Sequence, residues 1–538
     1  MRDVRQIHFP HRRSADQDRP QPRHHPLVIV GAGPVGLVAA LDLARKGHAS
    51  VVIDKKSSLS DGSRSICWAK RSLEIMDRLG VGQALTEKGI TWKTGKVFFD
   101  RGRVFEFDLL PDAQHRRPAF VNLQQYYLEH FCIEAAKRTG LIDLRWQEEV
   151  TSLTPTGDGL LLNIATPAGG YRLVSDWVIA ADGARSALRR SLGLAFEGRV
   201  FDDQFLICDV RLKLGRPAER WFWFDPPFNR GRSALLHRQA DDVWRLDFQV
   251  GASADRDQET RPDNVARRVR AMLGEDVAFA FEWISLYRFQ SRRLERFRHG
   301  RVLFAGDAAH QMSPFGARGG NSGIQDADNL VWKLDLVLRQ LAPATLIDSY
   351  DQERIAAADE NLINTTRSTD FIAPKSAISR AFRDGVLALA RTEPSARRLV
   401  NSGRLSVATH YQTSPLNGPD ALGPGVAPAV RPGAAALDAP VAAGWLHDHI
   451  GDGFVGVWFA RDPGLTQPFA RDAGLLSERA LPIKTVVVSD AIACERYGAE
   501  PAPAYYLFRP DQHVAARWRH PQRAAVEEAV ARATGSRC

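Results

Sequence analysis

The most regular pattern of hydrophobic and polar positions lies in residues 27–54. The apolar run 27–30 is followed by three closely spaced glycines, and a second apolar run, 51–53, ends in Asp54. Between the two runs, apolar residues recur at helical spacing, at Leu37, Ala40, Leu41 and Ala44. The segment therefore predicts a strand, a tight turn, a helix and a second strand parallel to the first.

Two more apolar runs end in an acid and a glycine. Residues 177–181 lead into Asp182 and Gly183, and residues 301–305 lead into Gly306 and Asp307. Helical patterns follow or precede them over residues 121–139, 188–192 and 324–339. Strands that alternate with helices predict an α/β fold with a parallel sheet, and ligands collect at the carboxyl ends of such strands.

The central segment, from about residue 196 to 292, has a different pattern. Short alternating runs at 205–212, 220–224, 233–238 and 243–249 are joined by charged turns, and one helix is expected over 264–273. This predicts a mostly antiparallel α+β domain inserted between two segments of the α/β domain. A hairpin is expected earlier, over residues 96–109, with its turn at 100–103.

The C-terminal region begins with a stretch crowded with Pro, Gly and Ala, residues 414–443, which reads as a connecting segment. Strands are expected over 453–459, 483–489 and 505–509, and a helix over 521–534. A further small α/β domain is therefore predicted at this end of the chain.

Composition narrows the classes of function. The 538 residues carry a formal net charge of +9, but acids are scattered among the arginines, and no basic helix or aromatic-interleaved patch predicts nucleic-acid binding. The five cysteines are far apart and form no CxxC, so neither a disulfide framework nor a metal site is expected, and a reducing, cytoplasmic location fits. No apolar run approaches the ~20 residues needed to span a bilayer. Residues 1–25 have no apolar core typical of a signal peptide and read as a disordered tail.

The first glycine motif carries specific chemistry. Gly31 permits the turn, Gly33 lets backbone N–H groups approach a pyrophosphate, and Gly36 lets the helix pack closely on the strand. Asp54 stands where an acid accepts hydrogen bonds from the adenosine ribose. A glycine-rich loop at 316–323 opens another helix, whose N-terminal N–H groups would face an anion. The sequence thus predicts a dinucleotide cofactor.

Three motifs in this order, GAGPVG, ADGARS and GDAAHQMSPFGARGGNSG, resemble the fingerprints of FAD-dependent aromatic hydroxylases, the group A flavoprotein monooxygenases. The similarity covers roughly residues 27–358 and is closest to the phenol hydroxylase and 3-(3-hydroxyphenyl)propionate hydroxylase branch. It implies a Rossmann-like, glutathione-reductase-like FAD-binding domain with the inserted substrate domain. The C-terminal region, down to YLFRPDQHVAARWR, resembles the thioredoxin-like domain of that branch, here without CxxC.

The resemblance also implies domain boundaries and residue roles. The expected division is a tail (1–25), the first segment of the FAD-binding domain (26–195), a substrate-binding sheet domain (196–292), the second segment of the FAD-binding domain with a helical region (293–412), a linker (413–443) and a thioredoxin-like domain (444–538). The residues expected to bind FAD or the nicotinamide are Gly31, Gly33, Gly36, Asp54, Lys55, Arg64, Gln125, Asp182, Gly183, Asp307, Gly319, Gly320 and Asn321. Arg64 matches a mobile arginine of the family, and Pro314 would lie against the flavin face where oxygen is activated.

The implied reaction is hydroxylation of a phenolic or aromatic compound, with NADPH or NADH as reductant and O2 as oxidant, through a C4a-hydroperoxyflavin. Substrate residues do not carry over from the family. The aromatic-rich central segment offers Trp221, Trp223 and Tyr287, and His237 leads the nearby polar candidates, which also include Arg238 and Asp247. A homodimer is compatible with the sequence.

Three other functions remain open at the level of sequence. WFWFDP at residues 221–226 nearly fits the WxWxIP motif of flavin-dependent halogenases, although Asp225 replaces the isoleucine. A flavin oxidoreductase that does not activate oxygen would need the same cofactor motifs. A non-catalytic FAD-binding protein that uses its tail domain for a partner is the alternative outside enzymes.

Overall fold

A parallel sheet forms the first layer of the molecule. The computed structural model describes residues 3–157, 159–400, 407–423, 425–466 and 481–536. The parallel strands lie in the order β18-β11-β1-β2-β8. Their bounds are β1 (Arg23–Val30), β2 (Ser50–Asp54), β8 (Ile142–Trp146), β11 (Gly169–Ala180) and β18 (Val302–Phe304), with β9 (Glu149–Thr156), β10 (Gly159–Thr166) and β17 (Arg298–His299) attached antiparallel. The predicted α/β class is confirmed.

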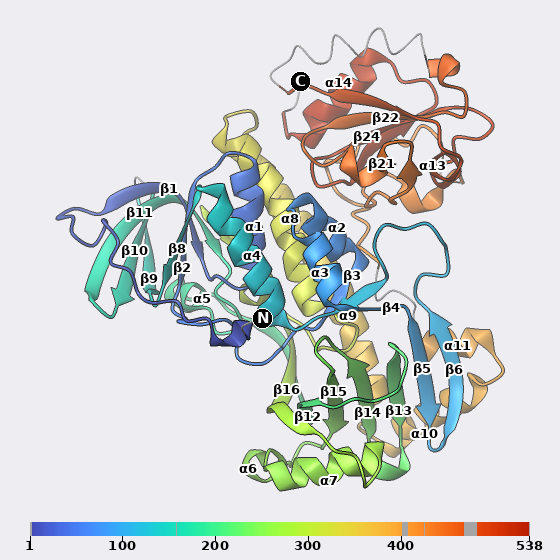
Figure 1. Ribbon diagram of the computed structural model, residues 1–538. Helices are drawn as coiled ribbons and strands as arrows, with labels where there is room; N and C mark the ends of the chain where they lie inside the picture. Colours follow the sequence, from blue (N-terminus) through green and yellow to red (C-terminus); the bar gives the residue numbers. More distant parts are fainter. Residues whose placement is uncertain (1–2, 158, 401–406, 424, 467–480, 537–538) are drawn as a thin grey trace.

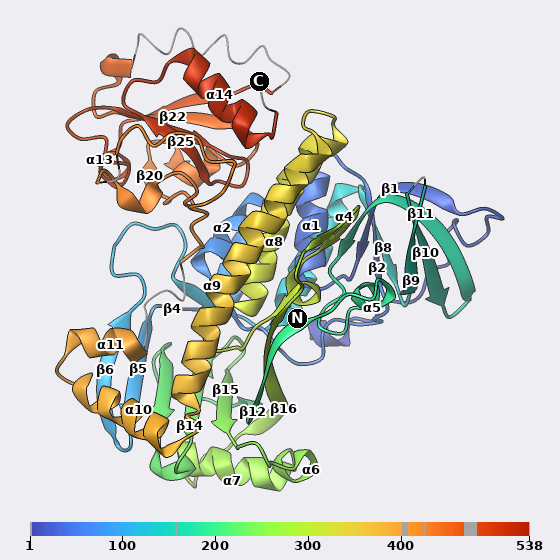
Figure 2. The ribbon, with the colours of Figure 1, turned by 180° about the vertical axis from the view of Figure 1, so that it is seen from behind.

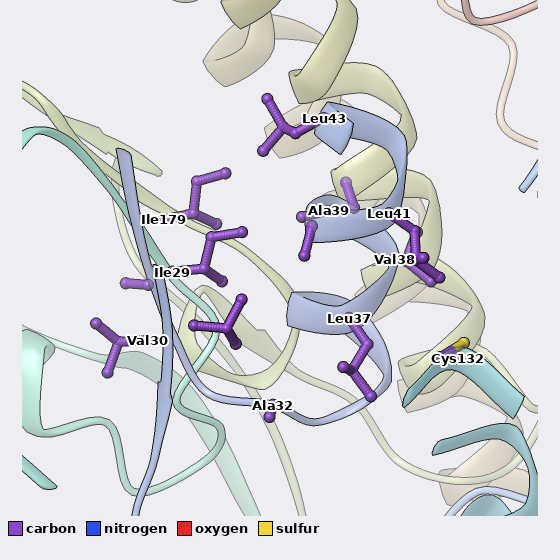
Figure 3. Close-up of a cluster of buried hydrophobic side chains, with 14 of the residues drawn as sticks. Ile29, Val30, Ala32, Leu37, Val38, Ala39, Leu41, Leu43, Cys132 and Ile179 are labelled. Atoms are coloured by element: carbon purple, nitrogen blue, oxygen red, sulfur yellow. The ribbon is translucent and has the colours of Figure 1, made fainter. Parts of the chain in front are cut away.

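Three helices pack together beside this sheet, α1 (Pro34–Arg45), α4 (Gln125–Thr139) and α8 (Gly319–Leu338) (Figure 1). Ile29 of β1 and Ile179 of β11 face Leu37, Ala39 and neighbouring apolar side chains of α1 (Figure 3). Two helix starts differ from the prediction. Helix α4 begins later because residues 120–122 form strand β7, and α8 begins earlier because the glycines of its loop already adopt helical geometry.

Shorter elements connect the first layer to the rest of the chain. They are β3 (Cys67–Ala69), α2 (Lys70–Arg78), α3 (Gly82–Lys88), β4 (Ile90–Trp92), β7 (Phe120–Asn122) and α5 (Ala187–Ser191). Strands β3 and β4 both pair with β7, so they form a small separate sheet.

The second large sheet is mostly antiparallel, in the order β19-β16-β12-β15-β14-β13-β5-β6. Its strands are β5 (Thr94–Phe99), β6 (Gly102–Asp108), β12 (Glu197–Arg211), β13 (Arg220–Phe224), β14 (Ser233–Arg238), β15 (Val243–Gln249), β16 (Ala280–Arg293) and β19 (His310–Gln311). The hairpin β5–β6 has the expected position, but it extends this sheet through a parallel pairing of β5 with β13. The second sheet therefore includes residues that precede position 196, which was the expected start of the substrate-binding domain.

The two faces of the second sheet have different neighbours. Helix α7 (Pro262–Leu273), preceded by the short α6 (Arg256–Glu259), packs on one face through Val265 and Val269. The long helix α9 (Asp348–Ile372) descends from the first layer to α10 (Ala377–Leu389) and α11 (Pro394–Val400), beside the second sheet (Figure 2). Ile372 and Leu387 pack on the end of the other face. The remainder of that face borders a cavity.

The C-terminal domain has a four-stranded sheet in the order β23-β22-β24-β25, in which only β22 and β23 are parallel. The elements are β20 (Pro440–Val441), β21 (Gly444–Trp445), β22 (Val455–Phe459), β23 (Lys484–Val488), α13 (Ala491–Arg496), β24 (Ala504–Phe508), β25 (Val514–Trp518) and α14 (Arg523–Ala533). The three predicted strands and the terminal helix are present. The domain lies beside α2 and α8, away from the second sheet (Figure 1).

Two segments differ from what their composition predicts. Residues 3–22, expected as a disordered tail, pack on the first domain: Phe9 is buried and stacks on Trp146, with ring centroids 4.2 Å apart, and Asp16 pairs with Arg145. The expected linker, 413–443, belongs to the C-terminal domain, since Ala435 pairs with His513 of the terminal strand region. Both segments bury apolar side chains that composition alone does not reveal.

Cysteines and helices give two further observations. The four cysteines within the described residues are free and buried, and Cys538 lies outside them. No helix in the described portion of the chain combines the length and the apolar character that a membrane crossing requires.

Candidate active site

Two cavities meet between the first layer and the second sheet. The larger, about 610 Å³, runs along the carboxyl ends of β1, β2 and β11. The smaller, about 310 Å³, lies against the second sheet. Both are lined by Arg64, Ser65, Ala184, Asp307, Gly319 and Gly320. A planar group at this shared wall would touch both cavities.

The glycine turn after β1 fits a pyrophosphate. Gly31 has φ of +107°, and a Cβ there would lie 2.3 Å from the carbonyl oxygen of Ala181. A Cβ on Gly36 would lie 1.9 Å from the oxygen of Gly31, whereas a Cβ on Gly33 would meet nothing within 4 Å. The first two glycines therefore allow close packing, while Gly33 leaves the cavity open at the N-terminus of α1, where anions bind favourably.

Asp54 ends β2 at the edge of the larger cavity. Its carboxylate accepts hydrogen bonds from the backbone N–H groups of Ala32, at 2.7 Å, and Lys56, at 2.9 Å. The carboxylate thus holds the glycine turn and still has lone pairs for a ribose. Lys55 also lines this cavity, but its ammonium group pairs with Glu149 at the surface.

Gln125 fastens the loop that carries Arg64. The Gln125 amide donates to Glu129 at 2.8 Å and accepts from the backbone N–H of Ser65 at 3.3 Å. Arg64 is exposed and lines both cavities. Both residues line the larger cavity, and Arg64 also lines the smaller one, while their binding of a cofactor stays a prediction.

Asp182 and Gly183 follow β11 on the opposite side of the larger cavity. One carboxylate oxygen of Asp182 accepts from the N–H groups of Ala187 and Leu188, while the other is buried without a protein partner. Burial raises the pKa of Asp182. Gly183 has φ of +76°, which favours glycine. These two residues shape the turn between β11 and α5 beside the larger cavity.

Asp307 and the N-terminus of α8 form the shared wall. The Asp307 carboxylate faces both cavities, and loss of solvation raises its pKa. Gly320 leaves no room for a side chain, because a Cβ would lie 2.8 Å from Oγ of Ser65. The Asn321 amide donates to the carbonyl oxygen of Cys67 and accepts from the N–H of Ala69. This wall offers a carboxylate that can accept hydrogen bonds from hydroxyl groups. It also offers a helix N-terminus, which favours a negatively charged flavin.

A buried charge cluster supports the wall from behind. The Asp326 carboxylate accepts from the N–H of Gly306 at 2.9 Å, contacts Nε2 of His310 at 2.7 Å and pairs with Arg354. Burial opposes ionisation of Asp326, but His310 and Arg354 lower its pKa to about 2. The GDAAH segment is therefore fixed to α8 and α9 by one carboxylate.

The smaller cavity is lined by one face of the second sheet. Phe205, Leu235 and Phe289 supply apolar wall, and Tyr287 and His237 line it as predicted. Pro314 also lines this cavity, on the side of the shared wall. An aromatic ring can occupy this cavity, where the apolar wall excludes water from it.

Trp221 and Trp223 do not line the cavity, contrary to the prediction. Residues alternate between the faces of a strand, and β13 turns both tryptophans toward the α7 side, where Trp223 packs with Val265 and Val269. The side chain of Arg238 lies near Trp244 on the same side. The two tryptophans of β13 therefore belong to the hydrophobic core and not to the cavity wall.

Sequence reasoning named Asp247 but missed Arg220 and Arg245, which line the same cavity. Register places Arg220 opposite His237, and His237 opposite Arg245. Arg245 forms two hydrogen bonds of 2.8 Å to the Asp209 carboxylate. Charged residues at the cavity-facing positions of otherwise apolar strands were the signal that could have found this polar row.

Burial shifts the titration of the polar row. Loss of solvation raises the pKa of Asp247 to about 6, although Arg245 and Arg220 oppose the shift. Burial and two nearby arginines hold the pKa of His237 well below its usual range, so its ring is neutral. Burial raises the pKa of the Cys67 thiol to about 11, which leaves it protonated.

Comparisons with known proteins agree with this geometry. The family model described as "FAD binding domain" matches residues 24–365. The 3-(3-hydroxy-phenyl)propionate/3-hydroxycinnamic acid hydroxylase of Klebsiella pneumoniae subsp. pneumoniae is 31% identical over 395 residues, which cover 72% of this chain and 70% of the relative. The 6-methylpretetramide 4-monooxygenase of Streptomyces rimosus is 31% identical over 409 residues, with the same coverage.

A solved structure extends the similarity to the C-terminal domain. The flavin-dependent monooxygenase PieE, in complex with FAD and substrate, matches with a TM-score of 0.79 and 22% identity, covering 96% of this chain and 100% of PieE. The chain therefore belongs to the FAD-binding domain family. It is an FAD-dependent monooxygenase of the aromatic hydroxylase type, with FAD as cofactor and a reduced nicotinamide and O2 as co-substrates.

Proposed function

We propose that this enzyme hydroxylates a phenolic compound that binds in the smaller cavity. The observation that carries the proposal is the shared wall, at which an apolar cavity with a polar row opens onto the cofactor cavity. One relative is named as a 3-(3-hydroxy-phenyl)propionate/3-hydroxycinnamic acid hydroxylase, and another as a 6-methylpretetramide 4-monooxygenase. Bound FAD supplies reduction by the nicotinamide and transfer of one oxygen atom from O2.

The chain's own residues have three tasks in this reaction. Gly33, Asp54 and Asp307 would hold the phosphates, the adenosine ribose and the ribityl hydroxyls. Phe205, Leu235 and Phe289 would position the ring and exclude water. Arg64, whose loop borders both cavities, would meet the nicotinamide.

The C-terminal domain is proposed to be thioredoxin-like and without redox activity. Its strand order, with one parallel pair and an antiparallel edge, supports that fold. Burial raises the pKa of Cys494 and disfavours its thiolate, and the sequence contains no CxxC. A structural role is therefore favoured. Free, buried cysteines support the proposed cytoplasmic location. A homodimer and the absence of nucleic-acid binding stay predictions.

The alternative functions predict different flavin kinetics. The halogenase hypothesis is disfavoured, because the WFWF part of the motif lies in β13 and its two tryptophans face α7. A reductase would consume NAD(P)H without hydroxylating an aromatic compound. A non-catalytic flavoprotein would hold FAD that NAD(P)H does not reduce.

The test follows the flavin absorbance of the purified holoenzyme. NADPH or NADH is added with and without a panel that begins with 3-(3-hydroxyphenyl)propionate and extends to polycyclic phenols. Reoxidation by O2 follows, and the products are analysed by mass spectrometry. We expect one phenol to accelerate flavin reduction and to yield a product that is about 16 mass units heavier, the mass of one oxygen atom. About one product molecule should form per NAD(P)H consumed. Rapid reduction with the phenol recovered unchanged would contradict the proposal.

A further inference from the structure

Asp247 is a half-buried acid on the wall of the smaller cavity. Within the described residues, its carboxylate has no hydrogen bond or ion pair, and its Oδ1 is buried. Buried carboxylates in proteins are normally paired or hydrogen-bonded. The remainder of the Asp247 side chain borders the cavity, where its carboxylate can accept a hydrogen bond from a bound molecule.

Arg220 is the complementary case. Its guanidinium borders the same cavity and has no hydrogen bond or ion pair within the described residues, whereas the nearby Arg245 is held by Asp209. Loss of solvation lowers the pKa of Arg220, but a guanidinium stays charged at neutral pH. The cavity wall thus presents a cation and a carboxylate that attract each other electrostatically but form no hydrogen bond or ion pair within the described residues.

Sheet register places both groups near one spot. Arg220, His237 and Arg245 follow one another across β13, β14 and β15, and Asp247 lies two residues along β15 on the same face. Beyond Asp247, the wall continues with Leu235 and Ile207, which are its register partners on the neighbouring strands. An aromatic ring on the apolar portion would direct a hydroxyl group toward the polar portion.

We propose that Asp247 is the base that accepts the proton of the substrate's phenolic hydroxyl, and that Arg220 binds the resulting phenolate oxygen. The inference rests on the proposed hydroxylase function and adds the residues that activate its substrate. The phenolic O–H bond breaks, the proton moves to the Asp247 carboxylate, and the electron pair stays on the phenolate oxygen. When the product leaves, the proton returns to it, and no oxidant or reductant is needed.

The surroundings suit this role. The charged or titratable groups next to Asp247 are Arg220, Arg245, His237, Asp209 and Cys67, and the same cavity is also lined by Arg64, Tyr287, Arg288, Asp307 and Arg318. Cys67 and His237 are neutral. A carboxylate that titrates near pH 6 is ionised at neutral pH and is a stronger base than an ordinary aspartate.

The test measures kcat and KM of the holoenzyme against pH, with 3-(3-hydroxyphenyl)propionate and with a ring-fluorinated analogue whose hydroxyl is more acidic. Asp247→Asn should lower kcat about 10²–10⁴-fold with the first compound and remove the decline of activity below about pH 6. The loss should be at least about tenfold smaller with the fluorinated compound, since that hydroxyl ionises without a base. Asp247→Glu should recover a fraction of the rate.

Arg220→Gln supplies a readout that a merely structural role would not move. Arg220 lowers the pKa of Asp247, so its loss should shift the acidic limb of the pH profile to higher pH. It should also raise KM about 10–100-fold through the lost charged hydrogen bond. Trp221→Phe, which lies on the other face of β13, is the control and should leave both parameters unchanged.

The outcomes separate the two levels of proposal. Equal losses with both compounds, or an Asp247→Asn enzyme with unchanged kcat, would overturn the role of Asp247 while the hydroxylase function stands. If the wild-type enzyme hydroxylates neither compound nor any other phenol, the proposed function fails, and the role of Asp247 as its base fails with it.

Discussion

The molecule contains two regions of buried charge that differ in pairing. At the junction with the C-terminal domain, Glu353 binds Arg509 and Lys333, and Arg509 also pairs with Asp511. All four side chains are completely buried. At the wall of the smaller cavity, Arg245 is paired with Asp209, but Arg220 and Asp247 have no partner among the described residues.

The pKa values of the titratable groups in the two regions differ in the same way. The cations around Glu353 and Asp511 lower the pKa of each carboxyl well below its usual range, and burial lowers the pKa of Lys333 to about 8. Burial raises the pKa of Asp247 to about 6. The junction charges are paired within the protein, whereas Arg220 and Asp247 at the cavity form no ion pair among the described residues. Burial alone therefore does not distinguish a structural ion from a functional one, while pairing does.

The junction also reaches toward the cofactor. Arg354, which pairs with Asp326 behind the flavin wall, donates to the Tyr411 hydroxyl at 2.8 Å. The Tyr411 ring stacks on His513, with centroids 4.7 Å apart. A continuous set of contacts thus joins the GDAAH segment to the C-terminal domain.

The largest effect is expected when the junction loses its central acid. Glu353→Ala leaves Arg509 and Lys333 buried with less compensation, and breaking a buried pair costs about 3–5 kcal/mol. The midpoint of urea unfolding, followed by tryptophan fluorescence, should fall accordingly. Glu528→Gln, which removes an exposed partner of Arg532, is the matched control and should change stability by less than about 1 kcal/mol. Similar midpoints for both variants would refute the structural role of the junction.

A comparison of two arginines within the cavity wall tests pairing directly. Arg245→Met leaves Asp209 buried without its cation and should cost about 3 kcal/mol. Arg220→Met removes a guanidinium without a protein partner and should change stability by no more than about 1 kcal/mol, in either direction. Thermal melting of the two holoenzymes measures the difference. If Arg220→Met proved as damaging as Arg245→Met, the distinction between paired and unpaired charges would be wrong.

The raised pKa of Asp247 predicts a dependence of stability on pH. Because the folded-state value, about 6, exceeds the usual 3.8, the native state holds an extra proton between these values. The contribution of Asp247 to wild-type stability should therefore fall as pH rises from about 4 to 6, by up to about 2–3 kcal/mol. The Asp247→Asn variant should not show this pH-dependent loss of stability. The melting temperature of the variant minus that of the wild type should increase over this range, and a constant difference would contradict the shift.

The smallest effect is expected on the outer face of the second sheet. Trp221 packs on the α7 side, against Arg216 and Lys96. Trp221→Phe should change KM for the aromatic substrate less than about twofold, whereas Leu235→Ala, which removes cavity wall, should raise KM about tenfold. Steady-state kinetics of the two variants decide whether the face assignment is right.

Local patterns predicted the cofactor side well. The positions of Gly31, Gly36 and Asp54 relative to their strands follow from chain connectivity, because a strand, a turn and a helix that are adjacent in sequence are adjacent in space. The same holds for the glycines that begin α8. The N-terminal packing of Phe9 and the pairing of β5 with β13 were not predictable in this way, since each depends on contacts between segments far apart in the chain.

The sequence by itself determined the α/β class, the FAD motifs and the strands of the inserted domain. These depend on short-range spacing, which glycine geometry and the periodicity of strands and helices fix. Only the tertiary structure decided which face of the second sheet meets the substrate. Side chains alternate between the two faces of a strand, so the sequence does not show which face meets the substrate. Choosing Asp247 over Trp223 required the register of five strands and the helix that covers the opposite side.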